Sequence, residues 1–208
     1  LEIERCKQHM SKLQYNGVKV VVYGECAGTV QGQIDTPVSK RPRFANEALW
    51  VAYGKRLDAF GAHLKSTYGI TLAYHHHMGA YVESPEDVDH LMSVTDPQSV
   101  GLLYDTGHAY FGGAVDPLLP LKKHIKRIVH VHCKDVRPKV IAQSRNDGWS
   151  FLSGVLNGTF TVPAGAAAGS HTVTYQICSI ALPTACDSAT ITIVIASAAI
   201  VATPDAGT

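Results

Sequence analysis

The stretch VGLLYDTGH, residues 100–108, is an unbroken apolar run that ends in an aspartate and a histidine. Two other stretches have the same form, ITLAYHHH at 70–77 and RIVHVHCKD at 127–135, and VKVVVYGE at 18–25 is a β-branched run. Strands that are buried on both faces carry such unbroken runs, as in parallel sheets covered by helices. These four stretches therefore predict four parallel strands.

Segments with helical spacing of apolar residues separate the predicted strands. The segment SPEDVDHLMSVT also begins with Ser84 as a predicted N-cap and Pro85 in the first turn. Alternation of strand and helix favours an α/β barrel over a doubly wound sheet, because the sequence has no G-x-G-x-x-G or Walker motif. Helices are predicted within residues 1–17, 45–69, 84–95, 116–125 and about 140–156. Adjacent parallel strands, in sequence order and in an open arc, are predicted at 18–24, 70–76, 100–105 and 127–133.

Polar side chains follow every predicted strand at its carboxyl end, where the active sites of (β/α)₈ barrels lie. They are Glu25, His75 to His77, Asp105 with His108 after a tight Thr-Gly turn, and His132 to Asp135. Mixed imidazole and carboxylate ligands suit Mn²⁺, Co²⁺, Zn²⁺ or Fe²⁺ better than Ca²⁺ or Mg²⁺. The imidazoles of His75 to His77, the carboxylate of Asp105 with the imidazole of His108, and His132 on the same face as His130 could therefore meet at one cation.

Composition limits the classes of partner. Hydrophobic residues make up 46% of the 208 residues and the formal net charge is +1, so the chain has a core but no basic field for nucleic acid. No apolar run reaches membrane-spanning length, and neither a nucleic-acid nor a membrane partner is expected. Cys6, Cys26 and Cys133 have no metal or redox spacing, which fits a reducing cytoplasm. The chain starts in helix-like sequence without an initiator Met, so we expect it to begin inside a longer protein.

Composition changes near Gly158, and two parts are predicted, an α/β part at 1–157 and a β tail at 158–208. HTVTYQI and ATITIVI alternate in polarity, which predicts an antiparallel hairpin of residues near 171–178 and 188–195. Cys178 and Cys186 would then approach each other, and a disulfide there would suit an oxidising compartment.

The motifs DTGHAYFGG, HVHCKDVRP and AYHHHMGA, with YGECAGTVQG and DGWSFLSGVLNGTFTVP, resemble the myo-inosose-2 dehydratase family. This family belongs to the superfamily of xylose-isomerase-like and AP-endonuclease-like TIM barrels, and the resemblance covers residues 1 to about 163. It implies a cytoplasmic lyase of inositol catabolism that removes water from a keto-inositol, a small polyol ketone. It also implies Mn²⁺ or Co²⁺, and glutathione, as cofactors.

The resemblance assigns site residues one by one. It places the aspartate ligand of the metal at Asp105, the histidine ligand at His132 and a further ligand at His75, for which His77 is a rival. We therefore predict that Asp105, His132 and at least one of His75 or His77 converge, with donor atoms roughly 3–4 Å apart. His108 matches a histidine that is a ligand in some relatives and a substrate contact in others. The glutamate ligand of the last barrel strand has no counterpart, and four strands are predicted where closure needs eight. We therefore expect an incomplete barrel that self-associates through sheet edges and does not dehydrate keto-inositol at a useful rate.

Dehydration beside a ketone needs a base for the proton, a stabiliser for the enolate and an acid for the departing hydroxyl. His77 or His108 could move protons near neutral pH. Lys134 could stabilise developing negative charge, and Glu25 could bind hydroxyls or act as a base.

Three alternatives remain for the α/β part or the whole chain. They are an AP-endonuclease-like metal-dependent phosphodiesterase, a sugar isomerase or epimerase of the same superfamily, and a non-enzymatic extracellular β module. The last follows from the tail, which resembles the closing strands of bacterial extracellular Ig-like repeats. A fused fragment without activity is a further possibility, because the two parts imply different compartments.

Overall fold

The structure, a computed structural model, describes residues 2–114, 116–159, 169–178 and 186–195. Its contacts divide the chain into two units, Leu1–Thr161 and Val162–Thr208. The division falls a few residues after the composition change near Gly158. Within the described residues, no helix is both long and apolar enough to cross a membrane.

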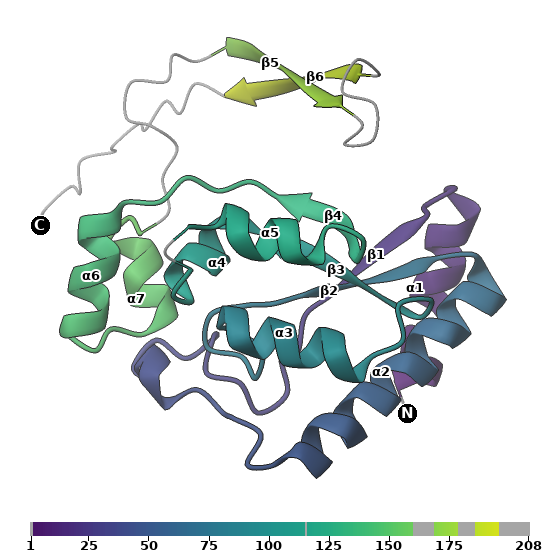
Figure 1. The fold of residues 1–208 in the computed structure, drawn as a ribbon, viewed down its shortest axis with the longest axis horizontal. Coiled ribbons are helices and arrows are strands. Elements are labelled where there is room, and N and C mark those ends of the chain that lie inside the picture. The colour runs from purple at the N-terminus through teal and green to yellow at the C-terminus, as the bar shows by residue number, and fades with distance from the viewer. Residues whose placement is uncertain (1, 115, 160–168, 179–185, 196–208) are drawn as a thin grey trace, which may run out of the picture. The chain divides into compact units, whose positions relative to one another are not determined.

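The first unit is built on a four-stranded parallel sheet, as the apolar runs predict (Figure 1). The strands follow the order of the sequence: β1 Val20–Tyr23, β2 Thr71–His75, β3 Val100–Asp105 and β4 Ile128–His132. All six residues of β3 are buried, as expected for a strand covered on both faces. The expectation is wrong for β4, whose three central residues are exposed, and for β1, none of whose residues is fully buried.

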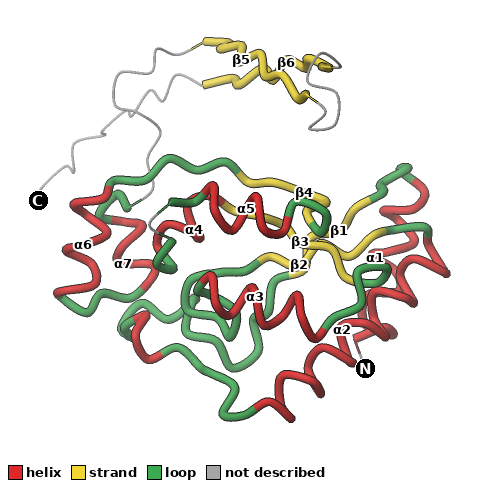
Figure 2. The backbone as a smooth tube through the Cα atoms, viewed as in Figure 1, coloured by secondary structure: helices red, strands yellow, loops and turns green. Residues whose placement is uncertain are grey.

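Helices at the predicted places surround this sheet (Figure 2). They are α1 Glu2–Tyr15, α2 Glu47–Tyr68, α3 Pro85–Val94 and α5 Leu118–His124. The Asn46 side chain caps α2, and Gly69 ends it in the left-handed conformation at φ 67°. Ser84 forms the predicted N-cap of α3, completed by Asp87 as a capping box.

Two expectations about local structure are wrong. The predicted Thr-Gly turn after β3 is the first turn of a short helix, α4 Thr106–Phe111, for which Asp105 is the N-cap. The single helical stretch expected near the end of the unit is two helices, α6 Pro138–Asn146 and α7 Phe151–Leu156. Gly148, at φ 65°, lies in the turn between them, a conformation that glycine adopts without strain.

The main core lies between the sheet and α2, where close backbone contact requires glycine. A Cβ at Gly61 would come 2.1 Å from the backbone oxygen of Ser99, and one at Gly54 would come 2.4 Å from that of Val94. A smaller cluster of buried residues, which we call the second core, consists of Val38, Met78, Phe111 and Ile141. It includes part of a short 3₁₀ helix, η1 Val38–Lys40.

The second unit contains an antiparallel hairpin of β5 Gly169–Cys178 and β6 Cys186–Ile195, which confirms that prediction. The backbone register places Cys178 opposite Cys186. Directly opposed residues have Cα atoms about 4.5–5.5 Å apart, which is within the range of a disulfide. The connection at 179–185 lies outside the described residues, and the disulfide stays a prediction.

Candidate active site

The carboxylate of Asp105, at the end of β3, is the centre of the site. The residue is fully buried, and its Oδ1 accepts hydrogen bonds of 3.0 Å from the backbone N–H groups of Gly107 and His108. Its own backbone N–H donates to Nε2 of His76 at 3.2 Å. One carboxylate oxygen is therefore committed to capping α4, and the other, Oδ2, is left to meet the neighbouring strands.

Basic side chains from β2, α4 and the end of β4 gather around this second oxygen. Nε2 of His75 lies 3.2 Å from Asp105 Oδ2, Nδ1 of His132 lies 3.4 Å away, and Nε2 of His108 lies 3.9 Å away. The ammonium of Lys134 forms an ion pair with the same oxygen. Parallel register explains the gathering, because Asp105 pairs with His132 across β3 and β4. The structure thus brings together Asp105, His75 and His132, the three residues predicted as ligands.

The protonation states favour cation binding. Burial would raise the pKa of Asp105, but the hydrogen bond from His75 and the Lys134 ammonium outweigh it, so the pKa is lowered and the carboxylate is ionised. Burial lowers the pKa of His108 and of His132. Neutral imidazole is the form in which histidine binds metals.

Backbone groups of Met78 determine which nitrogen carries the proton in two of the histidines. Its carbonyl oxygen lies 2.8 Å from Nδ1 of His77, so that Nδ1–H donates and Nε2 keeps its lone pair. Its N–H donates to Nδ1 of His108 at 3.4 Å, which leaves the proton of that ring on Nε2. The two rings lie 3.9 Å apart, and burial lowers the pKa of His77 to about 4. The backbone of Met78 therefore sets the Nε2 of His77 as a proton acceptor and the Nε2–H of His108 as a hydrogen-bond donor beside it.

The donor set fits a divalent cation of intermediate softness. Donor atoms of His75, Asp105 and His108 all lie within 4.8 Å of one another. The Met78 N–H and a proton occupy the two nitrogens of His108. His132 lies outside this group, but its Nδ1 is 3.4 Å from Oδ2 of Asp105. One carboxylate and two imidazoles suit Mn²⁺, Co²⁺, Zn²⁺ or Fe²⁺. The ammonium of Lys134 would compete with a cation for Oδ2 of Asp105, which shows that positive charge is favoured beside this oxygen.

Two residues near the site, Thr106 and Phe151, were not predicted. The hydroxyl of Thr106 joins the backbone N–H and carbonyl of Lys134 at 2.9 and 3.0 Å, which ties α4 to the end of β4. The ring of Phe151 lies 4.7 Å from that of His77 and 5.6 Å from that of His108. Thr106 follows Asp105 directly, and this position in the sequence could have identified it as a residue of the site. Phe151 had none, because it is distant in sequence.

Glu25 lies after the end of β1, where tyrosine hydroxyls hold its carboxylate. Its carboxylate accepts hydrogen bonds from the hydroxyls of Tyr53 at 2.9 Å and Tyr23 at 3.3 Å, and from the N–H of Ala27 at 3.2 Å. The hydroxyl of Tyr53 also lies 3.1 Å from that of Tyr74. Glu25 borders a hollow of about 700 Å³ over β1 and α2, whose lining contains none of the histidines. Its role as a base or as a ligand of substrate hydroxyls stays a prediction.

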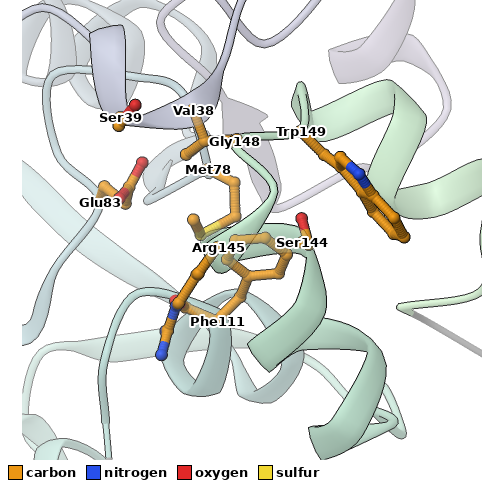
Figure 3. A pocket seen from close by; sticks show the side chains of 9 residues that line it. All are labelled: Val38, Ser39, Met78, Glu83, Phe111, Ser144, Arg145, Gly148 and Trp149. Carbon is orange, nitrogen blue, oxygen red and sulfur yellow. The ribbon is translucent and has the colours of Figure 1, made fainter.

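A separate cavity of about 150 Å³ borders the second core (Figure 3). Figure 3 shows Ser39 and Glu83 on one side of it and Ser144 and Trp149 on the other. Its lining is Val38, Ser39, Met78, Glu83, Phe111, Ser144, Arg145, Gly148 and Trp149. Met78 belongs to this lining and also bonds two histidines, so packing at the cavity is coupled to the site.

A parallel sheet with polar side chains at the carboxyl ends of its strands is the arrangement in which (β/α)-barrel proteins place their active sites. The sequence model of the xylose isomerase-like TIM barrel family matches residues 2–161. The chain belongs to this family, and its four strands form part of such a barrel.

Two curated sequences illustrate which proteins of this family the chain is similar to. The rhizopine catabolism protein MocC of Rhizobium meliloti is 46% identical over 162 residues, which are 78% of this chain and 49% of that protein. An inosose dehydratase of Clostridium perfringens is 42% identical over 156 residues, 75% of this chain and 52% of that enzyme. The chain thus spans about half the length of the curated relatives that it matches.

A solved structure shows the same fold. The "probable 3-DHS dehydratase AsbF" of Bacillus anthracis superposes with a TM-score of 0.51 at 15% identity, covering 64% of this chain and 44% of that one. At this identity the likeness concerns the fold alone.

Proposed function

We propose that this site belongs to a dehydratase of a cyclic polyol ketone, with 2-keto-myo-inositol as the substrate. The names of the relatives, inosose dehydratases among them, support the substrate class. The observation that carries the proposal is that His75, His132 and Lys134 all lie around one buried carboxylate oxygen, Oδ2 of Asp105.

A divalent cation held by Asp105, His75 and His132 would polarise the ketone oxygen and stabilise the enolate. Nε2 of His77 has the lone pair to accept the proton from the carbon beside the ketone. The electron pair of that C–H bond then forms the C=C bond as the neighbouring hydroxyl departs. His77, which holds that proton as an imidazolium, would return it to the departing hydroxyl, which leaves as water. Nε2–H of His108 would donate a hydrogen bond to this hydroxyl without giving up its proton.

The proposal also names the cofactors. Mn²⁺ or Co²⁺ as the cation, and glutathione as a second cofactor, rest on the family resemblance. The donor set is equally suited to Zn²⁺ and Fe²⁺. A cytoplasmic location is proposed as well, supported by Cys6, Cys26 and Cys133, which are free thiols.

Turnover by the 208-residue chain alone is proposed to be weak. Among the described residues, the group of potential ligands contains one carboxylate, that of Asp105. Loss of a ligand or of its support commonly lowers metal affinity or activity by about 10- to 100-fold. Self-association also stays a proposal, supported by apolar side chains exposed on the outer strands: Val22 at 44% and Val131 at 43%.

The test follows the first proton transfer separately from net dehydration. The chain is incubated with Mn²⁺ or Co²⁺ and keto-inositol in D₂O, and deuterium uptake beside the ketone is measured by NMR. We expect cation-dependent uptake that is lost in Asp105→Asn and kept in Asp135→Asn, an exposed carboxylate of the following loop. Absorbance of the unsaturated product should rise slowly or not at all.

Equal uptake in the unsubstituted chain and in Asp105→Asn would show that the site performs no such chemistry. An isomerase or epimerase shares the first proton transfer but keeps the water. Mass spectrometry of the product therefore separates these alternatives, and a product that retains its full mass would overturn dehydration.

A further inference from the structure

The middle residue of the histidine run has a role that the proposed chemistry does not use. His76 is 1% exposed, and its ring packs 5.7 Å from that of Tyr104 in β3. Its Nε2 accepts the backbone N–H of Asp105 at 3.2 Å. His76 thus contacts the strand that carries the central carboxylate, without contact to the carboxylate oxygens.

This hydrogen bond fixes the proton of the ring. Since Nε2 is the acceptor, the neutral ring carries its proton on Nδ1. Within the part of the chain that the structure describes, this buried Nδ1 has no hydrogen-bond partner. A buried polar group without a partner is rare, and where one occurs a buried water is a frequent explanation.

A small void beside His76 has the size of one water. Its volume is about 10 Å³, and its lining includes His76, Glu83 and Tyr104. A void needs about 10–15 Å³ of this kind of volume, and two to four polar partners, to hold a water. Glu83 supplies an acceptor, and its carboxylate is anchored by the N–H of Gly79 at 2.8 Å and by Arg41 at 3.3 Å.

We propose that His76 is a positioning residue for Asp105, and that one buried water links its Nδ1–H to the carboxylate of Glu83. The inference rests on the proposed metal site for its consequence, but its geometry is independent of the reaction. The backbone of Asp105 is held from one side by His76, and its Oδ1 is held from the other by α4. Together these contacts determine where Oδ2 meets His75 and His132.

The first experiment reads the tautomer in the unsubstituted chain. Long-range ¹H–¹⁵N NMR of the histidine rings, with His76 assigned by its loss in His76→Gln, distinguishes a protonated nitrogen from one with a lone pair. We expect a neutral His76 with the proton on Nδ1. A proton on Nε2 at neutral pH would overturn the proposal, whatever the fate of the substituted proteins.

The second experiment measures Co²⁺ affinity, with Co²⁺ alone as the probe and visible absorption as the signal. His76→Leu keeps the bulk but removes the acceptor, and we expect affinity to fall by about 10- to 100-fold. His76→Gln keeps an acceptor for the Asp105 N–H and a donor for the water, so affinity should return to within a few-fold. Tyr104→Phe, which borders the same void, is the matched control and should bind as the unsubstituted chain does.

Two results would contradict a positioning role. One is a folded His76→Leu with unchanged affinity, and the other is an equal loss in all three variants, which would indicate general loosening of the core. If the unsubstituted chain binds no Co²⁺, the proposed metal site is wrong, and the tautomer alone then decides the role of His76.

Discussion

Replacement of Arg41 by Met should destabilise the first unit more than any surface substitution. The Arg41 side chain is 3% exposed and lies 2.6 Å from Asp87 and 3.3 Å from Glu83, whose side chains are 18% and 13% exposed. It also donates to the backbone oxygens of Ala80 and Tyr81 at 3.3 and 3.0 Å. Met fills a similar volume but leaves two largely buried carboxylates without their cation.

Removing one partner of a buried ion pair typically costs about 3–5 kcal/mol, because the remaining charge is left uncompensated. We expect a loss of this size in the free energy of unfolding. The raised pKa of Glu83, caused by burial, indicates that its charge is already unfavourable there. The double variant Arg41→Met with Glu83→Gln should therefore recover part of the loss.

Urea titration followed by circular dichroism gives the measurement, with Arg43→Met, a neighbouring and less buried arginine, as the control. A change below about 1 kcal/mol in Arg41→Met, the size typical of exposed pairs, would refute the reasoning. So would a double variant that is less stable than the single one.

Three further results are expected. Lys134→Met should bind Co²⁺ about tenfold more tightly, or by 1.4 kcal/mol, because its ammonium competes for Asp105, and weaker binding in a calorimetric titration would argue against this. Gly61→Ala should lower the unfolding free energy by about 1–3 kcal/mol because its Cβ meets backbone at 2.1 Å, whereas Gly24→Ala, which has open space, should change it little in urea titrations. Burial would raise the pKa of Asp89, but hydrogen bonds from Lys123 and His124 of α5 outweigh burial and lower the pKa. The ionised carboxylate therefore stabilises the fold above the unfolded pKa of about 3.9, and this stabilisation is lost as the pH falls. Asp89→Asn should thus lower the urea midpoint at pH 7 but hardly at pH 2, and an equal effect at both would contradict it.

The sheet was predictable because its signal is local. Each strand is an apolar run with a polar residue at its carboxyl end, and parallel pairing then brings those ends together. This logic brings Asp105, His132 and the histidines at 75–77 to one edge but does not choose among those histidines. The structure has His75 and His132 beside one oxygen of Asp105. Ser84 and Pro85 likewise mark the start of α3 by their own chemistry.

What was missed depends on contacts distant in sequence. Nothing local shows that His76 faces the core while His75 faces the site, or that Arg41 is buried by carboxylates more than 40 residues away. The exposure of β4 could not be read from its apolar residues, because it depends on which elements cover the strand. Glu25 follows a strand as the others do, but its hydrogen bonds to tyrosines of β1 and α2 could not be inferred from the sequence.

The most direct test of the site is a Co²⁺ titration of the chain followed by visible absorption, with Asp105→Asn beside it. Co²⁺ in a site of imidazole and carboxylate ligands absorbs visibly, and the band saturates at the number of ions bound. We predict that one ion binds per chain. In Asp105→Asn the band should be lost, or the Co²⁺ affinity should fall by about 10- to 100-fold, whereas Asp135→Asn should keep both the band and the affinity. The absence of a saturable band, or a band unchanged in Asp105→Asn, would contradict the claim that this carboxylate and its histidines form a metal site.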